Sequence, residues 1–290
     1  MKWLVFGGNG WIGTMVVRFL EFIKEEVVLA ESRADEEKSV ECEIDAVHPD
    51  RVLCLIGRTH GDGYATIDYL EQKGKLVENV RDNLYAPLTL AMSCRQRGIH
   101  LTYLGTGCIF TYDNPEERVI QQEDDVPNFT GSSYSTVKGF TDRVMHHPLL
   151  ADCVLNVRIR MPIVGFHHPR NFITKIVNYA KICSLPNSMT VLDDMIPVMI
   201  DLARQGKTGT YHLTNPGVMT HNEILELYRT YVDSDKTWEN FTLDEQDAVL
   251  ASKRSNNQLS SEVVMRLYPH VPTLRDSVER LMKRWNTTNE

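Results

Sequence analysis

The first part of the chain alternates between short apolar runs and amphipathic stretches. Residues 3–6, 26–30, 51–57 and 99–105 are compact apolar runs, which is the pattern of strands buried in a sheet. The segments between them, such as TMVVRFLEFIKEE and residues 75–97, carry apolar positions at helical spacing. This alternation predicts an α/β fold of the Rossmann type, with a doubly wound and mostly parallel sheet.

The pattern becomes mixed after about residue 165. We expect a Rossmann domain over residues 1–165 and a smaller C-terminal mixed domain over residues 166–290. Segments near 189–214 are expected to return to the sheet, because LDDMIPVMIDLARQG has helical spacing and TYHLTN has the pattern of a strand. A ligand site is expected in the cleft between the two domains.

Composition excludes several classes of protein. The chain of 290 residues carries a net charge of −8, which argues against nucleic acid as the main partner. Its 6 cysteines are scattered without a CxxC pair, so we expect reduced thiols, no metal site and a cytoplasmic location. The N-terminal apolar run is too short for a signal peptide, and no window reaches the roughly 18 apolar residues of a membrane span. We expect a soluble enzyme or binding protein.

A glycine-rich turn follows the first strand. Gly7, Gly10 and Gly13 are spaced as GxxGxxG between that strand and the next helix. In dinucleotide-binding turns the first glycine permits the tight turn, the second lets a pyrophosphate approach, and the third packs helix on strand. The helix N-terminus, at Trp11 and Ile12, would offer N–H groups to the phosphates. A purely structural turn is the alternative.

The end of the second strand bears on which dinucleotide binds. A carboxylate at this position favours a ribose 2′-hydroxyl, whereas an arginine favours a 2′-phosphate. The sequence supplies both, in Glu31 and Arg33. Arg33 favours NADPH, and a solvated charged turn is the alternative.

Tyr134 and Lys138 lie four positions apart and so share one face of a predicted helix. A lysine ammonium near a phenol favours the phenolate, which would let Tyr134 exchange protons near neutral pH. YxxxK alone is a weak signal, and a solvated helix face is its usual meaning. Thr106 at the end of the preceding strand, together with the glycine turn, makes the combination specific for catalysis.

These motifs resemble the extended short-chain dehydrogenase/reductases, in the sugar-nucleotide branch related to dTDP-4-dehydrorhamnose reductase and GDP-fucose synthase. The resemblance is strongest to the bifunctional 3,5-epimerase/4-reductases of UDP-L-rhamnose synthesis. It extends over nearly the whole chain, through GWIG, TGCIF, PNFTGSSYSTVK, RMPI, HPRNFITKI, LPNSMTVLDDMIP, TNPGVMTHNEILE and RSNNQLS.

The resemblance implies that NADPH and a UDP-sugar are the ligands, bound by the first and second domains respectively. It implies conversion of UDP-4-keto-6-deoxy-D-glucose to UDP-L-rhamnose. The dehydratase that often precedes this domain in plants is absent from the sequence, so the substrate is expected to arrive already oxidised at C4. Asn83 matches an asparagine that supports the catalytic lysine. A homodimer is expected.

Cys108 takes the position of the epimerase base in this resemblance, after Gly107, where simple 4-reductases usually carry an aspartate. The chemistry agrees with that role. A C4 ketone acidifies the C–H bonds at C3 and C5, because each carbanion is stabilised as an enolate. Thiols ionise close enough to neutral pH to serve as bases. An inert buried cysteine is the alternative.

Lys175 is expected to be the acid on the opposite face of the sugar, at a position where fucose synthases carry a histidine. A surface or phosphate-binding lysine is the alternative. Arg254 and Asn256 lie in a loop that resembles the one closing over the substrate diphosphate. Asn171 and Asn187 are candidates for contacts with the sugar or uridine.

Other functions remain possible from the sequence alone. A plain 4-reductase would use Thr106, Tyr134 and Lys138 and leave Cys108 idle. A 4-epimerase would recycle tightly held NAD. A non-catalytic redox sensor is disfavoured because the tyrosine and lysine are intact. The sequence leaves open UDP against dTDP and strict NADPH against dual use of NADH and NADPH.

Overall fold

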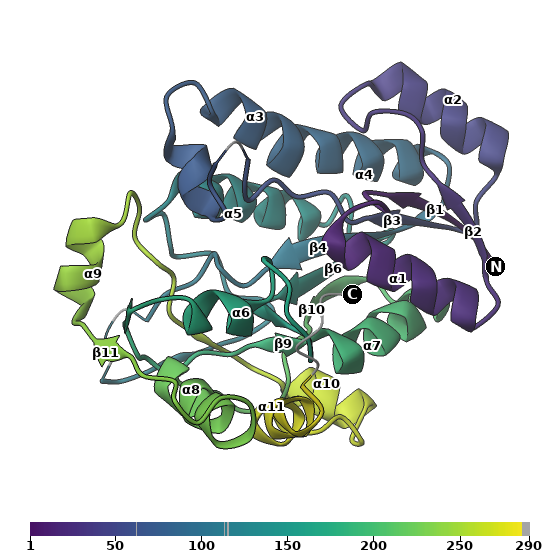
Figure 1. Ribbon diagram of the computed structural model, residues 1–290. Helices are drawn as coiled ribbons and strands as arrows, with labels where there is room; N and C mark the ends of the chain where they lie inside the picture. The colour runs from purple at the N-terminus through teal and green to yellow at the C-terminus, as the bar shows by residue number, and fades with distance from the viewer. Residues whose placement is uncertain (62, 113, 115, 286–290) are drawn as a thin grey trace.

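The computed structural model describes residues 1–61, 63–112, 114 and 116–285. A six-stranded sheet runs through its centre in the order β10-β6-β4-β3-β1-β2 (Figure 1). All neighbouring strands in it are parallel. The strands are β1 (Lys2–Phe6), β2 (Glu26–Leu29), β3 (Arg51–Cys54), β4 (His100–Thr106), β6 (Val154–Ile159) and β10 (Gly209–His212). The predicted doubly wound α/β fold is confirmed.

Helices cover both faces of this sheet (Figure 1). In β1, Trp3 and Val5 belong to the core on one face, while Leu4 and Phe6 belong to the core on the other. Successive residues of a strand point to opposite faces, so a strand buried on both sides is apolar throughout. The helices are α1 (Trp11–Phe22) and α7 (Leu192–Arg204) on one face, and α2 (Glu37–Val47), α4 (Ala86–Gln96) and α5 (Ser133–Met145) on the other.

The strand order places a topological switch point between β1 and β3. After β1 the chain adds β2 on one side, then crosses over to add β3 and β4 on the other side. This is the flavodoxin-like variant of the doubly wound sheet, and such sheets bind ligands at the carboxyl ends of the strands that flank the switch. The glycine turn follows β1 directly and therefore lies at that point.

The connection from β3 to β4 differs from the single helix expected over residues 75–97. It consists of the 3₁₀ turn η1 (Ile67–Glu71), α3 (Leu76–Val80), the π-helical turn η2 (Arg81–Tyr85) and α4. The helix is continuous in direction but widens at η2. In a π turn each N–H donates to the carbonyl five residues earlier instead of four, and apolar spacing does not signal this change.

A second lobe gathers at the lower left of Figure 1 around its own core. Ile163, Ile173, Ile224 and Val278 are fully buried there. Its helices are α6 (Phe172–Val177), α8 (His221–Tyr231), α9 (Leu243–Val249) and α11 (Leu274–Lys283), while α10 (Glu262–Leu267) packs against β10. Short parallel strand pairs complete the fold: β7 (Pro162–Ile163) with β9 (Thr190–Val191), β8 (Lys181–Ile182) with β11 (Glu239–Asn240), and β5 (Ile120–Gln121) with β12 (Gln258–Leu259).

The chain passes between the second lobe and the sheet more than once. After α6 and β9 it returns through α7 to β10, which pairs with β6 at the edge of the sheet. The division at residue 165 stays a prediction. Within the described residues, no helix has both the length and the apolarity that crossing a bilayer requires.

Candidate active site

The glycine turn has a different steric demand at each glycine. Gly7 has φ +82°, and a Cβ there would lie 2.9 Å from the carbonyl carbon of Leu55. A Cβ on Gly13 would lie 2.1 Å from the carbonyl oxygen of Gly7, so this glycine is required for packing α1 on the turn. A Cβ on Gly10 would meet only the Gly7 oxygen, at 3.2 Å, and Gly10 lines the cavity described below. Gly10 therefore keeps space free for a ligand, as a phosphate-binding turn requires.

A cavity of about 860 Å³ opens at the carboxyl ends of the central strands. The glycine turn, with Trp11 and Ile12, lines one end, and segments of the second lobe around α6 and α9 line the other. Among the described residues that line it there is no aspartate or glutamate. Its basic side chains are Lys138, Arg160, Arg170, Lys175, Lys181 and Arg254. In a chain with a net charge of −8, such a cavity selects for anions.

Thr106, Cys108 and Tyr134 meet on one wall of this cavity. Thr106 ends β4, and its Oγ1 accepts a hydrogen bond from the Cys108 N–H at 3.1 Å. Tyr134 lies in the first turn of α5, which Ser132 caps, and it packs against Cys108. The sequence prediction that these residues lie together agrees with this geometry.

Gly107 lies between Thr106 and Cys108 and packs against Leu259. A Cβ on Gly107 would lie 2.6 Å from Cδ1 of the Leu259 side chain, so a larger residue here would require that leucine to move. Cys108 is half-buried and lines the cavity beside Thr106.

The electrostatics of Tyr134 differ from the expectation that Lys138 promotes its phenolate. Burial, reinforced by the neighbouring Cys108, raises the pKa of Tyr134 above its ordinary value, and the Thr106 hydroxyl opposes this shift. Burial also lowers the pKa of Lys138 to about 8. The Lys138 ammonium donates to the Tyr103 hydroxyl at 2.5 Å and to the Leu104 carbonyl at 3.4 Å. The Lys138 ammonium is thus directed at Tyr103, and burial dominates the shift at Tyr134, so Tyr134 is a neutral proton donor.

Lys175 projects into the cavity from α6. Its ammonium forms no hydrogen bond or ion pair with any described residue, and the side chain is partly buried. Burial, followed by Arg170 and Arg254, lowers the pKa of Lys175, which brings it closer to the range of a useful acid. Asn171 caps α6 and is fully buried, with its amide donating to the carbonyls of Val164 and Phe166. The structure thus gives Asn171 a capping role and leaves it outside the cavity lining.

The loop that carries Arg254 and Asn256 closes the far end of the cavity. Arg254 pairs with Asp68 at 2.6 Å, so one carboxylate already holds this guanidinium in place. Asn187 is fully buried, where it accepts from Arg160 at 2.6 Å and donates to Asn256 at 2.9 Å. Asn187 does not line the cavity, and its position supports Arg160 and Asn256 instead.

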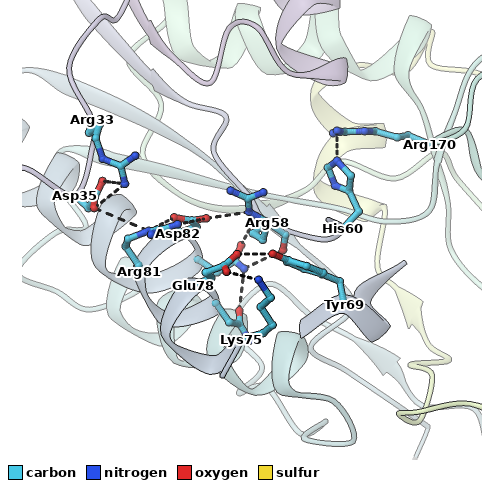
Figure 2. A network of polar contacts seen from close by, with 12 residues as sticks. Arg33, Asp35, Arg58, His60, Tyr69, Lys75, Glu78, Arg81, Asp82 and Arg170 are labelled. Atoms are coloured by element: carbon cyan, nitrogen blue, oxygen red, sulfur yellow. Dashed lines mark hydrogen bonds and ion pairs between the residues drawn. The ribbon is translucent and has the colours of Figure 1, made fainter. Parts of the chain in front are cut away.

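Arg33 also lies outside the cavity lining, on the surface after β2. Its side chain is 57% exposed and pairs with Asp35 at 2.9 Å (Figure 2). Arg81 and Arg58 continue this network through Asp35 and Asp82. An adenosine 2′-phosphate at the end of β2 would therefore meet Arg33 with a carboxylate already attached.

Asn83 lies in the π turn, behind the cavity wall. Its side chain exchanges hydrogen bonds with the backbone of Arg58 at 3.1 and 3.0 Å. Its carbonyl oxygen accepts from the Thr141 hydroxyl of α5 at 2.6 Å. Asn83 thus joins the loop after β3 to the helix that carries Tyr134 and Lys138, rather than lining the site.

Sequence reasoning missed some of the cavity's polar residues. One of them is Arg160, which is fully buried, lines the cavity, and has a buried Nε without a partner among the described residues. His60 and Arg170 are two more, since both line the cavity. Arg160 and Arg170 lie within matched motifs, RMPI and HPRNFITKI, and that was the available signal.

The chain is similar to one known protein family and to several proteins of known structure. The model of the RmlD substrate binding domain family matches residues 1–286. The crystal structure of a UDP-rhamnose synthase from Acanthamoeba polyphaga mimivirus is 56% identical in sequence with a TM-score of 0.94, covering 98% of this chain and 99% of that one.

Two further relatives are more distant. A bifunctional dTDP-4-dehydrorhamnose 3,5-epimerase/dTDP-4-dehydrorhamnose reductase of Arabidopsis thaliana is 38% identical over 293 residues, which is 100% of this chain and 95% of that protein. A dTDP-4-dehydrorhamnose reductase of Bacillus anthracis, solved in complex with NADP, has a TM-score of 0.79 at 16% identity and covers 98% of this chain and 99% of that one. At that identity the likeness concerns the fold.

Proposed function

This chain belongs to the RmlD substrate binding domain family, and from that premise we propose that it is a bifunctional 3,5-epimerase and NADPH-dependent 4-reductase. Its substrate would be UDP-4-keto-6-deoxy-D-glucose and its product UDP-L-rhamnose. The observation that carries the proposal is the pairing of Cys108 with Thr106 and Tyr134 on one wall, with an unpaired Lys175 in the same cavity. The relatives, a UDP-rhamnose synthase among them, support the class of reaction.

The charges of the cavity suit two ligands that each contain a diphosphate. A dinucleotide and a nucleotide sugar together bring several negative charges. The described lining offers basic side chains and no carboxylate to receive them. The free space around Gly10 fits a dinucleotide phosphate at the glycine end, which leaves the end near Arg254 for the sugar nucleotide.

Epimerisation uses the acidity that the C4 ketone gives to C3 and C5. The Cys108 thiolate removes the proton from one carbon, and the electron pair of that C–H bond becomes the enolate. Thr106 and Tyr134 donate hydrogen bonds to the C4 oxygen, where the negative charge collects. Lys175, or a water that it orders, returns a proton to the opposite face of the carbon. Proton exchange with solvent resets Cys108 and Lys175 before the second inversion.

Reduction uses the same wall of the cavity. NADPH, when bound, supplies the hydride for C4. Tyr134 holds the C4 oxygen and supplies the proton that completes the alcohol, which fits its burial and neutral state. Lys138 lies one turn further along α5, where it would hold the nicotinamide ribose.

Deuterium exchange separates the two half-reactions. In deuterated water with NADPH, the wild-type protein should convert UDP-4-keto-6-deoxyglucose to UDP-rhamnose with deuterium at C3 and C5. Cys108→Ser should incorporate little deuterium at either carbon, because a hydroxyl ionises far less readily than a thiol. The same variant should still reduce a substrate whose C3 and C5 are already inverted. NMR of the sugar measures both outcomes.

Two further variants test the roles of Lys175 and Tyr134. Lys175→Ala should keep exchange but lose most inversion, since the base remains while protonation from the opposite face is impaired. Tyr134→Phe should lose reduction while it still binds NADPH. Full exchange and inversion by Cys108→Ser would show that another residue is the base, and the corresponding dTDP-sugar tests the preference for the nucleotide.

A further inference from the structure

Two contacts join the start of the second lobe to the glycine end of the cavity. The His168 ring stacks on Trp11 of the glycine turn, with ring centroids 4.9 Å apart and planes 5° apart. Two residues later, the Arg170 guanidinium donates to Nε2 of His60, in the loop after β3 (Figure 2). Residues 168–170 therefore lie against both segments that flank the switch point, which is where the dinucleotide is proposed to bind.

Arg170 has a charge without a counterion. It forms no ion pair with a carboxylate of any described residue, and the described residues lining the cavity include no carboxylate. Burial and the nearby Arg58 lower the pKa of Arg170, so its surroundings disfavour the cation. A partly buried guanidinium in this setting is expected to receive its anion from a bound ligand.

His60 presents a second donor at the same place. Since Nε2 accepts from Arg170, the imidazole is neutral and its proton lies on Nδ1. That Nδ1 is buried and has no partner among the described residues. Burial, followed by Arg170, Arg58 and Lys175, lowers the pKa of His60 and keeps it in this neutral form.

We infer that Arg170 binds the diphosphate of the dinucleotide and that His60 is the positioning residue that orients its guanidinium. The inference rests on the proposed function for the presence of a dinucleotide. It adds a phosphate contact from the second lobe to those of the glycine turn. A sugar nucleotide also carries a diphosphate, but the stacking of His168 on Trp11 places Arg170 at the glycine end of the cavity.

The test is direct binding of NADPH, NADH and UDP by calorimetry to wild type and to Arg170→Gln. Loss of a charge-assisted contact should weaken NADPH and NADH alike, by about tenfold to a hundredfold, and leave UDP within about twofold. Arg170→Lys keeps the positive charge but not the planar guanidinium, so its affinity for NADPH should lie between those of wild type and Arg170→Gln. Arg18→Gln, at an exposed arginine of α1 outside the cavity, is the matched control and should match wild type.

The positioning role of His60 has its own readout. His60→Gln keeps an acceptor for the guanidinium and should retain most NADPH affinity, whereas His60→Leu should lose several-fold. Unchanged NADPH binding by Arg170→Gln, or a loss confined to UDP, overturns the inference. These outcomes are read without turnover, so they stay separate from the proposed reaction, which fails if wild type binds NADPH yet forms no UDP-rhamnose.

Discussion

At the residue scale, the Arg33–Asp35 ion pair affects how strongly the protein should prefer NADPH to NADH. An exposed ion pair of this kind is strongly screened by solvent, whereas a 2′-phosphate brings more negative charge and several acceptor oxygens to the same guanidinium. We therefore expect the 2′-phosphate to displace Asp35 from the Arg33 guanidinium. Breaking the ion pair lowers the affinity that the phosphate contact adds but does not cancel it.

Arg33→Ala is accordingly expected to weaken NADPH binding about tenfold or more and NADH binding little. Asp35→Asn should have the opposite effect on selectivity, because it removes the competing carboxylate and its repulsion of the phosphate. Fluorescence titration of each variant with both dinucleotides measures the ratio. Equal effects of Arg33→Ala on the two would remove Arg33 from the recognition of the 2′-phosphate.

Residues that act locally could be predicted from the sequence. Tyr134 and Lys138 share a helix, and Thr106 and Cys108 share a strand end, so spacing alone brought each pair together. The His60–Arg170 contact joins residues separated by 110 positions, which no local pattern reports. Asn171 and Asn187 were predicted as candidates for contacts with the sugar or uridine, but a buried asparagine equally suits a helix cap, as Asn171 does, or a bridge between other polar side chains, as Asn187 does.

At the element scale, the turn from β1 to α1 distinguishes a glycine kept for a ligand from a glycine kept for packing. Gly10→Ala should cost little melting temperature and lower NADPH affinity, because a Cβ there meets only the Gly7 oxygen, at 3.2 Å, and Gly10 lines the cavity. Gly13→Ala should destabilise the protein itself by about 1–3 kcal/mol, the usual cost of overpacking. Thermal unfolding and NADPH titration of both variants measure this contrast. Equal loss of stability in the two would contradict it.

The major elements were predictable because their apolar patterns are strong. The central strands and the helices of the sheet follow from runs and spacings that local sequence displays. The π turn at 81–85 and the two-residue strands β5, β7, β8, β9, β11 and β12 were not predicted. Tertiary contacts fix such short elements, as when the Asn83 carbonyl binds Thr141 of a different helix.

At the scale of the whole molecule, a buried polar network ties α5 to the sheet and to the C-terminal segments. Asp142 of α5 accepts from Arg158 of β6 at 2.7 and 2.8 Å. Arg158 also donates to His212 of β10 at 3.0 Å, and His212 contacts the Ser260 carbonyl at 3.1 Å. The helix that carries Tyr134 is thus fixed by two strands of the sheet and by a segment near the C-terminus.

This network and His221 predict loss of stability in mild acid. Burial, followed by Arg158, lowers the pKa of His212 to about 3, and burial, followed by Arg160, lowers the pKa of His221 to about 4. Histidines in the unfolded chain titrate near 6.5, so below that pH the unfolded state binds the additional protons. The free energy of unfolding should fall by up to about 1.4 kcal/mol per pH unit and histidine as pH drops from about 6.5 toward 4.

Urea unfolding at pH 7 and pH 5 measures this loss. Glu123, 3.8 Å from His212, acts in the opposite direction, because burial raises its pKa and the folded state then takes up its proton. His221→Phe keeps a ring beside Phe172 and should lose the share of the pH slope that His221 contributes, while His60, His100 and His168, whose pKa values burial also lowers, keep theirs. His147→Gln, at an exposed site, should keep all of it. A slope that His221→Phe leaves unchanged would contradict the assignment.

The overall arrangement was predictable in class but not in detail. A doubly wound sheet follows from alternating strands and helices, whereas the order β2-β1-β3-β4-β6-β10 depends on which strands pair across long connections. The expected homodimer stays a prediction, and light scattering over a range of concentrations would test it.

The return of the chain to its own sheet has a consequence for synthesis. When the ribosome has released residues 1–165, five of the six strands exist, but α7 and β10 do not. One face of the sheet, with Trp3, Val5 and Leu155, then lacks the helix that completes its cover. The nascent chain must keep this apolar face and the open edge of β6 from aggregating until residue 212 has emerged. The first half of the chain is thus synthesised first, but its sheet can be completed only after α7 and β10 have been made.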